Sequence, residues 1–217
     1  MHSMNCLSSW SGGKDSAFAL FLSISGGYAP KALLNMMNEN GRVSRSHGLP
    51  LGILKQQADA LSIPLHAVPS TWNAYEANFI KSLQYLKAEY AISQVIFGDI
   101  DLEPHREWEE KVCQQAGLQA QLPLWQRNRK ELVMEMLAAG FETMIVSCQS
   151  SMGPTWLGRI LNSDLVEELE AIGIDACGEN GEFHTLVTFC PLFKKRIQPQ
   201  ISGKTIHQDY CFLEFKS

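Results

Sequence analysis

The feature that most limits the fold of this chain is the run Ser11-Gly12-Gly13-Lys14-Asp15-Ser16. It lies between an apolar segment, 6–10, and helix-compatible sequence at 15–23. Adjacent glycines allow backbone conformations and close approaches that a side chain would block. A helix N-terminus also directs backbone N–H groups and partial positive charge at an anion. We therefore predict a strand, a phosphate-binding loop and a helix in succession.

The side chains of this loop add charge and hydroxyl donors. Lys14 supplies a point charge, which we expect to make little contact with the core, and Asp15 can hold Mg²⁺ against phosphates. The loop is not a Walker A sequence, because Asp15 follows the lysine and no glycine stands five positions before Gly13. This excludes ordinary kinases and GTPases. The alternative is a plain glycine turn, which seldom carries all these groups.

Strand-like apolar runs alternate with helical patterns through the first half of the chain. Apolar runs occupy 32–37, 63–68 and 94–97, and helical spacing occupies 51–61 and 79–90. This alternation predicts an α/β fold of Rossmann-like type, with a mainly parallel sheet and helices on both faces. Ligands of such sheets bind beyond the carboxyl ends of the strands.

Two further polar segments follow predicted strands at that edge. One is the long polar loop 38–47, and the other is the pair Gly98-Asp99. Gly98 would let adenine or ribose lie against the backbone, and Asp99 would bind a ribose hydroxyl or the metal, although a simple turn is the alternative. In the next helix, Arg106 and Glu110 share a face, where an exposed ion pair is the simplest interpretation.

The second half predicts a smaller α+β domain. Asn128 precedes one helix, 141–148 is apolar enough for a strand, and Ser163 is a candidate cap for another helix. The chain ends in two expected antiparallel strands joined near 202–203. The predicted domains are 1–125, which binds the nucleotide, and 126–217, which binds the substrate.

The segment Gly178-Glu179-Asn180-Gly181-Glu182-Phe183-His184-Thr185 concentrates polar groups before an apolar run. Two carboxylates, an amide, an imidazole and a hydroxyl are suited to binding an amine, holding a metal or moving a proton. A solvent-exposed turn at Asn180-Gly181 is the alternative.

Composition limits the partners. The chain has 18 lysines and arginines against 23 acidic residues, a net charge of -5, which argues against a broad basic surface for nucleic acid. No apolar run is long enough to span a membrane, so we expect a cytoplasmic protein. The six cysteines contain no CxxC pair, so neither a zinc site nor a disulfide framework is indicated.

The order of these motifs, together with Leu124-Trp125, resembles the diphthine–ammonia ligase family of PP-loop ATP pyrophosphatases over nearly the whole chain. The resemblance implies that Mg²⁺-ATP adenylates a carboxylate on a small molecule or protein, releasing pyrophosphate, and that ammonia displaces AMP to form an amide. The best known acceptor is diphthine, a modified histidine of the archaeal and eukaryotic elongation factor. It also implies a Rossmann-like domain covered by a smaller C-terminal one.

The resemblance assigns roles by position. The nucleotide-binding set is Ser11, Gly12, Gly13, Lys14, Asp15, Ser16, Gly98 and Asp99. The set assigned to acceptor or ammonia is Arg106, Glu179, Asn180, Gly181, Glu182 and Thr185. The residues expected to act in catalysis are Lys14, Asp15, Glu182 and His184, with Mg²⁺ on Asp15.

Three departures from the family pattern concern the acceptor side. Asn180 replaces a glycine, His184 replaces a glutamate, and the usual Arg-x-Arg-Val-Glu pattern appears as Arg106-Glu107-Trp108-Glu109-Glu110. With these changes, the sequence resembles a bacterial branch of the family. Because bacteria lack diphthamide, the elongation factor is an expected partner only for an archaeal or eukaryotic source.

Two other functions fit the phosphate loop. A PP-loop sulfurtransferase would use a cysteine to deliver sulfur, with Cys148 and Cys177 as the candidates. A non-catalytic ATP-binding sensor would use a related α/β fold. The missing CxxC pair and the acidic composition disfavour the first, and Lys14-Asp15 with the acidic 178–185 segment disfavours the second.

Overall fold

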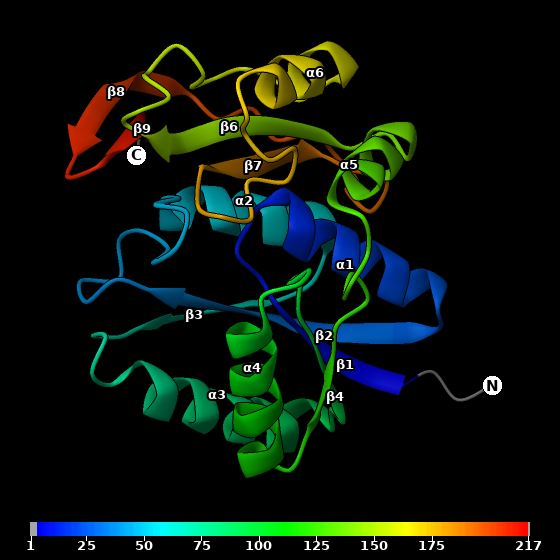
Figure 1. Cartoon of the computed structure of the whole chain (residues 1–217). Coiled ribbons are helices and arrows are strands. Elements are labelled where there is room, and N and C mark those ends of the chain that lie inside the picture. The colour runs from blue at the N-terminus through cyan, green and yellow to red at the C-terminus, as the bar shows by residue number, and fades with distance from the viewer. Residues whose placement is uncertain (1–3, 217) are drawn as a thin grey trace.

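Two β-sheets separated by a pair of helices make up the computed structural model, which describes residues 4–216 (Figure 1). Residues 1–3 and 217, at the ends of the two predicted domains, lie outside the described residues. The strands are β1 Met4–Ser9, β2 Tyr28–Met37, β3 Leu65–Pro69, β4 Gln94–Ile96, β5 Gln119–Gln121, β6 Glu142–Gln149, β7 Phe183–Phe189, β8 Ile201–His207 and β9 Tyr210–Phe215. The helices are α1 Lys14–Ser25, α2 Leu51–Leu61, α3 Tyr75–Tyr90, α4 Glu103–Ala116, α5 Arg129–Ala138 and α6 Ser163–Ala171.

The first sheet is parallel throughout and has the strand order β3-β2-β1-β4-β5. Strand order reverses at β1, because β2 pairs on one side of it and β4 on the other. Such a switch point leaves a crevice at the carboxyl ends of the two neighbouring strands. The predicted α/β class is confirmed, and the phosphate loop (residues 11–16) follows β1 directly.

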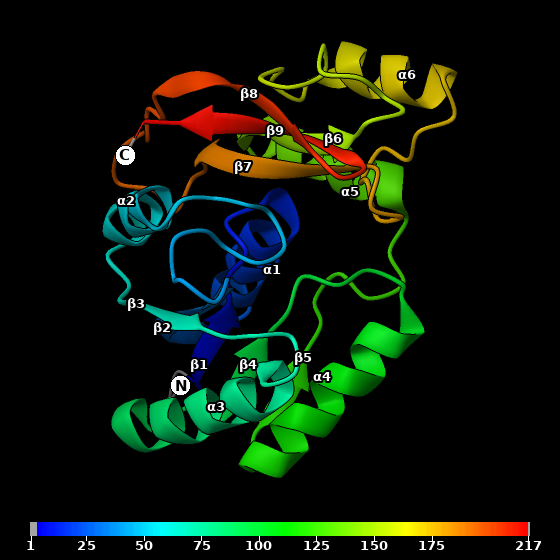
Figure 2. The ribbon, with the colours of Figure 1, turned by 90° about the vertical axis from the view of Figure 1, so that its left-hand side faces the viewer.

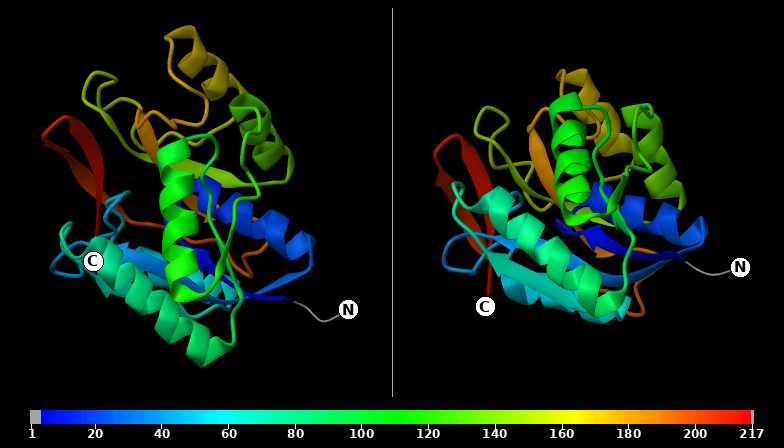
Figure 3. Two further views of the ribbon diagram at one scale, coloured as in Figure 1. Left: turned by 60° about the horizontal axis from the view of Figure 1, so that its bottom comes forward. Right: turned by 90° about the horizontal axis from the view of Figure 1, so that it is seen from below.

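Helices cover both faces of the parallel sheet. Helices α1 and α2 lie between the two sheets, and α3 and α4 cover the opposite face (Figure 2). Seen from below, α3 and α4 lie in front of the strands (Figure 3). A separate apolar cluster fills each side of this sheet, one of them under α3 and α4.

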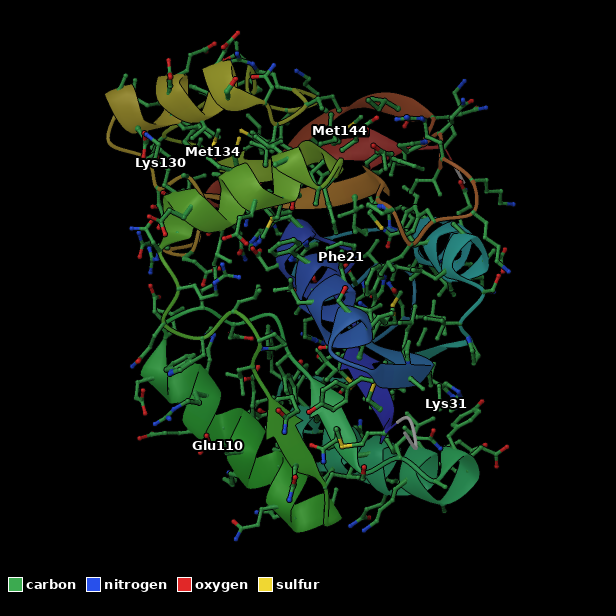
Figure 4. All side chains as sticks on the ribbon, turned by 90° about the vertical axis from the view of Figure 1, so that its right-hand side faces the viewer. Phe21, Lys31, Glu110, Lys130, Met134 and Met144 are labelled. Carbon is green, nitrogen blue, oxygen red and sulfur yellow. The ribbon has the colours of Figure 1, made fainter. Side chains whose placement is uncertain are left out.

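The apolar cluster between the sheets contains residues from both halves of the chain. On α1, Phe18 and Phe21 meet Phe141 edge to face, with ring centroids 5.5 and 5.6 Å apart. Phe21 lies on the side of α1 that faces the second half (Figure 4). Because one core serves both halves, the second sheet holds the first helix in place.

The second sheet is antiparallel, with the order β7-β6-β9-β8, which confirms the expected smaller C-terminal part. Two local predictions were wrong. The cap of α6 is Asn162, whose side chain accepts a hydrogen bond from the Leu165 N–H, so Ser163 is the first helical residue. The final hairpin turns at 208–209, where Gln208 has φ of 53°, and not near 202–203, which lies inside β8.

Strand β5 is too short and too polar to stand out in the sequence, and we did not expect it. Among the described residues, no helix is long and apolar enough to cross a lipid bilayer.

Candidate functional site

A cavity of about 610 Å³ opens at the carboxyl ends of β1 and β4. Its size is in the range of small-molecule sites. The first half lines it with residues from the phosphate loop, the 38–47 loop and the segment after β4, and the second half lines it from the 178–185 segment. The predicted site residues in its lining are Ser11, Lys14, Asp15, Ser16, Gly98, Asp99, Glu179, Asn180, Gly181, His184 and Thr185.

The phosphate loop is shaped by its glycines. Gly12 has φ of +87°, and a Cβ atom there would lie 2.8 Å from Oε1 of Gln57. A Cβ at Gly13 would lie 2.3 Å from Cε1 of His47. The hydroxyl oxygens of Ser11 and Ser16 are 3.0 Å apart at the start of α1. The two glycines therefore pack against α2 and the 38–47 loop, while the hydroxyls face the cavity.

Gln57 is a fully buried residue that the sequence analysis missed. Its Nε2 donates to the carbonyls of Gly12 and Val187, both at 2.9 Å, and its Oε1 accepts from the indole of Trp10 at 3.0 Å. The Val187 N–H donates to the Gly12 carbonyl at 3.0 Å. Strand β7 and helix α2 thus fix the loop by its main chain. A polar residue among the apolar positions of α2 was the available signal.

Lys14 is only 2% exposed, so our expectation of little core contact was wrong. Its Nζ donates to the two Asp15 oxygens at 2.8 and 2.7 Å and to the Cys177 carbonyl at 2.5 Å. The second half covers the lysine and supplies that carbonyl. Burial opposes the charge, but neighbouring Asp15 and Glu179 outweigh it and raise the pKa of Lys14.

One wall of the cavity is acidic. Burial, together with repulsion from Asp15 and Asp99, raises the pKa of Glu179 to about 7. Asp99 accepts a hydrogen bond from Nδ1 of His105 at 2.7 Å. Gly98 brings this wall against the phosphate loop, because a Cβ there would lie 2.7 Å from the backbone of Asp15. Close packing of β4 on α1, which we did not foresee, is thus one reason for this glycine.

Two adjacent histidines, with rings tilted by 35° to each other, also line the cavity. The rings of His47 and His184 have centroids 4.7 Å apart, and Nδ1 of His47 lies 3.0 Å from the Thr185 carbonyl. Burial is the main cause that lowers their pKa values, to about 4 and about 3, and nearby Lys14 adds to it. Both imidazoles are therefore neutral at pH 7. His47 was not predicted, although it lies in the polar loop that we expected at the site.

Four predicted residues are not in the lining of this cavity: Gly12 and Gly13, which pack against α2 and the 38–47 loop, and Glu182 and Arg106. The carboxylate of Glu182 accepts from the backbone N–H and the side-chain amide of Asn180, both at 2.9 Å, and lines a separate hollow beside Arg129. This position supports the backbone of the 178–185 segment and gives no support to direct catalysis by Glu182, which stays a prediction. Arg106 pairs with Glu103 on the surface of α4, and its guanidinium stacks 5.2 Å from the ring centre of Trp125.

The two candidate sulfur carriers are buried thiols. Burial raises the pKa of Cys148 to about 11 and that of Cys177 to about 12. Cys177 lines the cavity, but its thiol donates to the Arg129 carbonyl at 3.0 Å. A neutral thiol is a poor nucleophile, so the geometry gives no support to sulfur transfer.

The fold and site define a Rossmann-like protein of the PP-loop class. Its parallel sheet has a switch point at β1, a glycine-lysine loop follows that strand, and a second sheet covers the loop. Sequence models described as the diphthamide synthase N-terminal domain and C-terminal domain match residues 4–120 and 128–217. The chain belongs to the diphthamide synthase family.

Curated relatives agree with this assignment. The diphthine–ammonia ligases of Rattus norvegicus and Homo sapiens are each 28% identical over 232 residues, covering 93% of this chain and 85% of theirs. That of Schizosaccharomyces pombe is 27% identical over 99% of this chain and 39% of its own length. A predicted subunit of tRNA methyltransferase from Methanocaldococcus jannaschii, a solved structure, aligns with a TM-score of 0.46 and 18% identity over 89% of this chain and 100% of its own. The expected family and its ligase class are confirmed.

Proposed function

We propose that the protein is an ATP-dependent carboxylate–ammonia ligase that works through an acyl-adenylate. The observation that carries this proposal is the shared cavity, in which the phosphate loop and the 178–185 segment face each other. Nucleotide activation and amide formation need both sets of groups at one place. The relatives named diphthine–ammonia ligase support the same chemistry.

In the first step, an acceptor carboxylate attacks the α-phosphorus of ATP and pyrophosphate leaves. Ser11, Ser16 and the first turn of α1 would hold the phosphates with hydroxyls, backbone N–H groups and the helix dipole. Lys14 would turn from Asp15 towards the leaving pyrophosphate and neutralise its developing charge. The covering second sheet would exclude water from the adenylate.

Asp15 is the residue suited to hold Mg²⁺. Its carboxylate is 22% exposed and lines the cavity, and its charge adds to those of Asp99 and Glu179 nearby. Magnesium often takes one protein carboxylate together with phosphates and water, so this donor set fits. The ion would supply charge neutralisation at the phosphates.

In the second step, ammonia attacks the acyl carbon and AMP leaves. Glu179 lines the cavity and is suited to hold ammonium and accept a proton. His184, a neutral imidazole, offers a hydrogen-bond acceptor elsewhere in the lining of the same cavity. The family's glutamate at this position would be charged, so His184 implies an acceptor substrate different from diphthine.

Product analysis tests the proposal. The protein is incubated with Mg²⁺-ATP, ammonia and a panel of small and protein-borne carboxylates, including diphthine-bearing elongation factor, and products are separated by chromatography. We expect AMP and pyrophosphate, and an amide with one acceptor. ADP and phosphate as the main products would refute the proposal. His184→Glu should change the preferred acceptor while ATP affinity stays the same.

A further inference from the structure

Glu109 is a buried carboxyl group in a place where apolar packing is expected. It lies on α4, is 4% exposed, and its Oε2 has no hydrogen-bond partner among the described residues. Burying a carboxyl group is costly unless it is protonated or paired, so its presence calls for a partner.

That partner is Asp99, which lies between Glu109 and the cavity. His105 and Glu109 are one turn apart on α4, so both reach towards the same carboxylate. His105 donates to Oδ1 of Asp99 at 2.7 Å, and Asp99 is the neighbour that, after burial, most raises the pKa of the Glu109 carboxyl group. Asp99 lines the cavity and its side chain is 26% exposed, whereas Glu109 stands behind it.

The pKa values of Glu109 and Asp99 indicate which of the two carboxyl groups carries a proton. Burial is the main cause that raises the pKa of Glu109 to about 11, and the neighbouring Asp99 adds to it. Burial opposes the charge on Asp99, but the hydrogen bonds from His105 and Glu109 outweigh it and lower its pKa. At neutral pH, Glu109 is therefore the donor and Asp99 the acceptor. The oxygen lone pairs of Asp99 that remain face the cavity.

We propose that Glu109 is a positioning residue that orients Asp99 to accept a hydrogen bond from a ribose hydroxyl of ATP. A hydroxyl suits this carboxylate better than Mg²⁺, because His105 already donates a hydrogen bond to one of its oxygens. The inference rests on the proposed function.

The test compares nucleotides that differ by one hydroxyl. ATP, 2′-deoxyATP and 3′-deoxyATP are titrated by calorimetry into the wild type, Glu109→Val, Glu109→Gln and the control Glu110→Gln. We expect Glu109→Val to weaken ATP binding about tenfold, yet to leave affinity unchanged for the nucleotide that lacks the contacted hydroxyl. Glu109→Gln keeps a donor and should stay within about twofold of the wild type. Glu110, on the outer face of α4 (Figure 4), should have no effect.

Several results would overturn the inference. If Glu109→Val lost the same affinity for all three nucleotides, the role of Glu109 would be merely structural. If its ATP affinity were unchanged, Glu109 would have no role in nucleotide binding. A loss in Glu109→Gln as large as in Glu109→Val would mean that the donor is irrelevant. If Glu109→Val does not fold, His105→Ala removes the other donor from an exposed position and must show the same hydroxyl-specific loss. Failure of the wild type to bind ATP would instead refute the proposed function.

Discussion

The phosphate loop and the 178–185 segment face each other across one cavity, but they are held in different ways. The phosphate loop is fixed through its main chain, by Gln57 and by the Val187 N–H, and its lysine is held through the side chain, by Asp15 and the Cys177 carbonyl. In the 178–185 segment, the side chains also build the loop, since Glu182 is bound to Asn180. Polar side chains of one motif can therefore either act on a ligand or hold the loop in its conformation.

The largest effect is expected for Lys14→Ala. Loss of an oriented charge in the transition state should lower the rate of AMP formation by about a hundredfold or more. Because Lys14 is buried against Asp15 and the Cys177 carbonyl, the variant should also lose about 1–3 kcal/mol of stability. Product chromatography and thermal unfolding measure the two effects. Lys31→Ala, on β2, is the control, and full activity of Lys14→Ala would contradict the assignment of the phosphate loop.

Gln57→Leu tests whether the phosphate loop depends on its main-chain support. The change leaves the Trp10 indole unpaired and removes hydrogen bonds from the Gly12 and Val187 carbonyls. Stability should fall by about 3 kcal/mol, and ATP affinity by about tenfold. Denaturant unfolding and calorimetry give both numbers. Gln56→Leu, one position earlier and exposed, should change neither; comparable losses there would mean that α2 responds to any leucine.

Glu179→Gln and Glu182→Gln distinguish a carboxylate that acts on the substrate from one that holds the 178–185 segment in place. Glu179→Gln should lower the rate of amide formation about tenfold and leave ATP affinity unchanged. Glu182→Gln should lower the same rate by less than about threefold. In the wild type, the rate should rise with pH as Glu179 ionises near pH 7. That rise should disappear in Glu179→Gln. Should Glu182→Gln be the more damaging change, our division of the two carboxylates is wrong.

The last prediction concerns acid stability. His47 and His184 have folded pKa values of about 4 and 3, below the ordinary 6.5, so the unfolded chain binds protons first as pH falls. Stability should therefore be lost progressively from about pH 6.5 down to about pH 3. His184→Gln should flatten this dependence in denaturant titrations. Identical slopes for variant and wild type would show that the buried imidazoles do not titrate as described.

Sequence reasoning reached the fold class and most of the cavity lining, because glycine-lysine loops and strand alternation are local signals. It did not find Gln57 or His47, whose roles depend on contacts with residues 12–13 and 185–187. It also placed Glu182 with Glu179, since spacing along a loop does not say which side each carboxylate faces. The domain boundary after residue 125 stays a prediction.

The hydrogen bond from the Val187 N–H to the Gly12 carbonyl has a consequence for synthesis of the chain. Domains tend to fold from the N-terminus as they emerge from the ribosome. A nascent chain of about 120 residues holds all five strands of the parallel sheet, but not the strand that holds its phosphate loop. In that nascent chain, Lys14 would be exposed to water, because the Cys177 carbonyl that accepts its hydrogen bond has not yet been made. The phosphate loop therefore gains this main-chain hydrogen bond only after translation has passed residue 187.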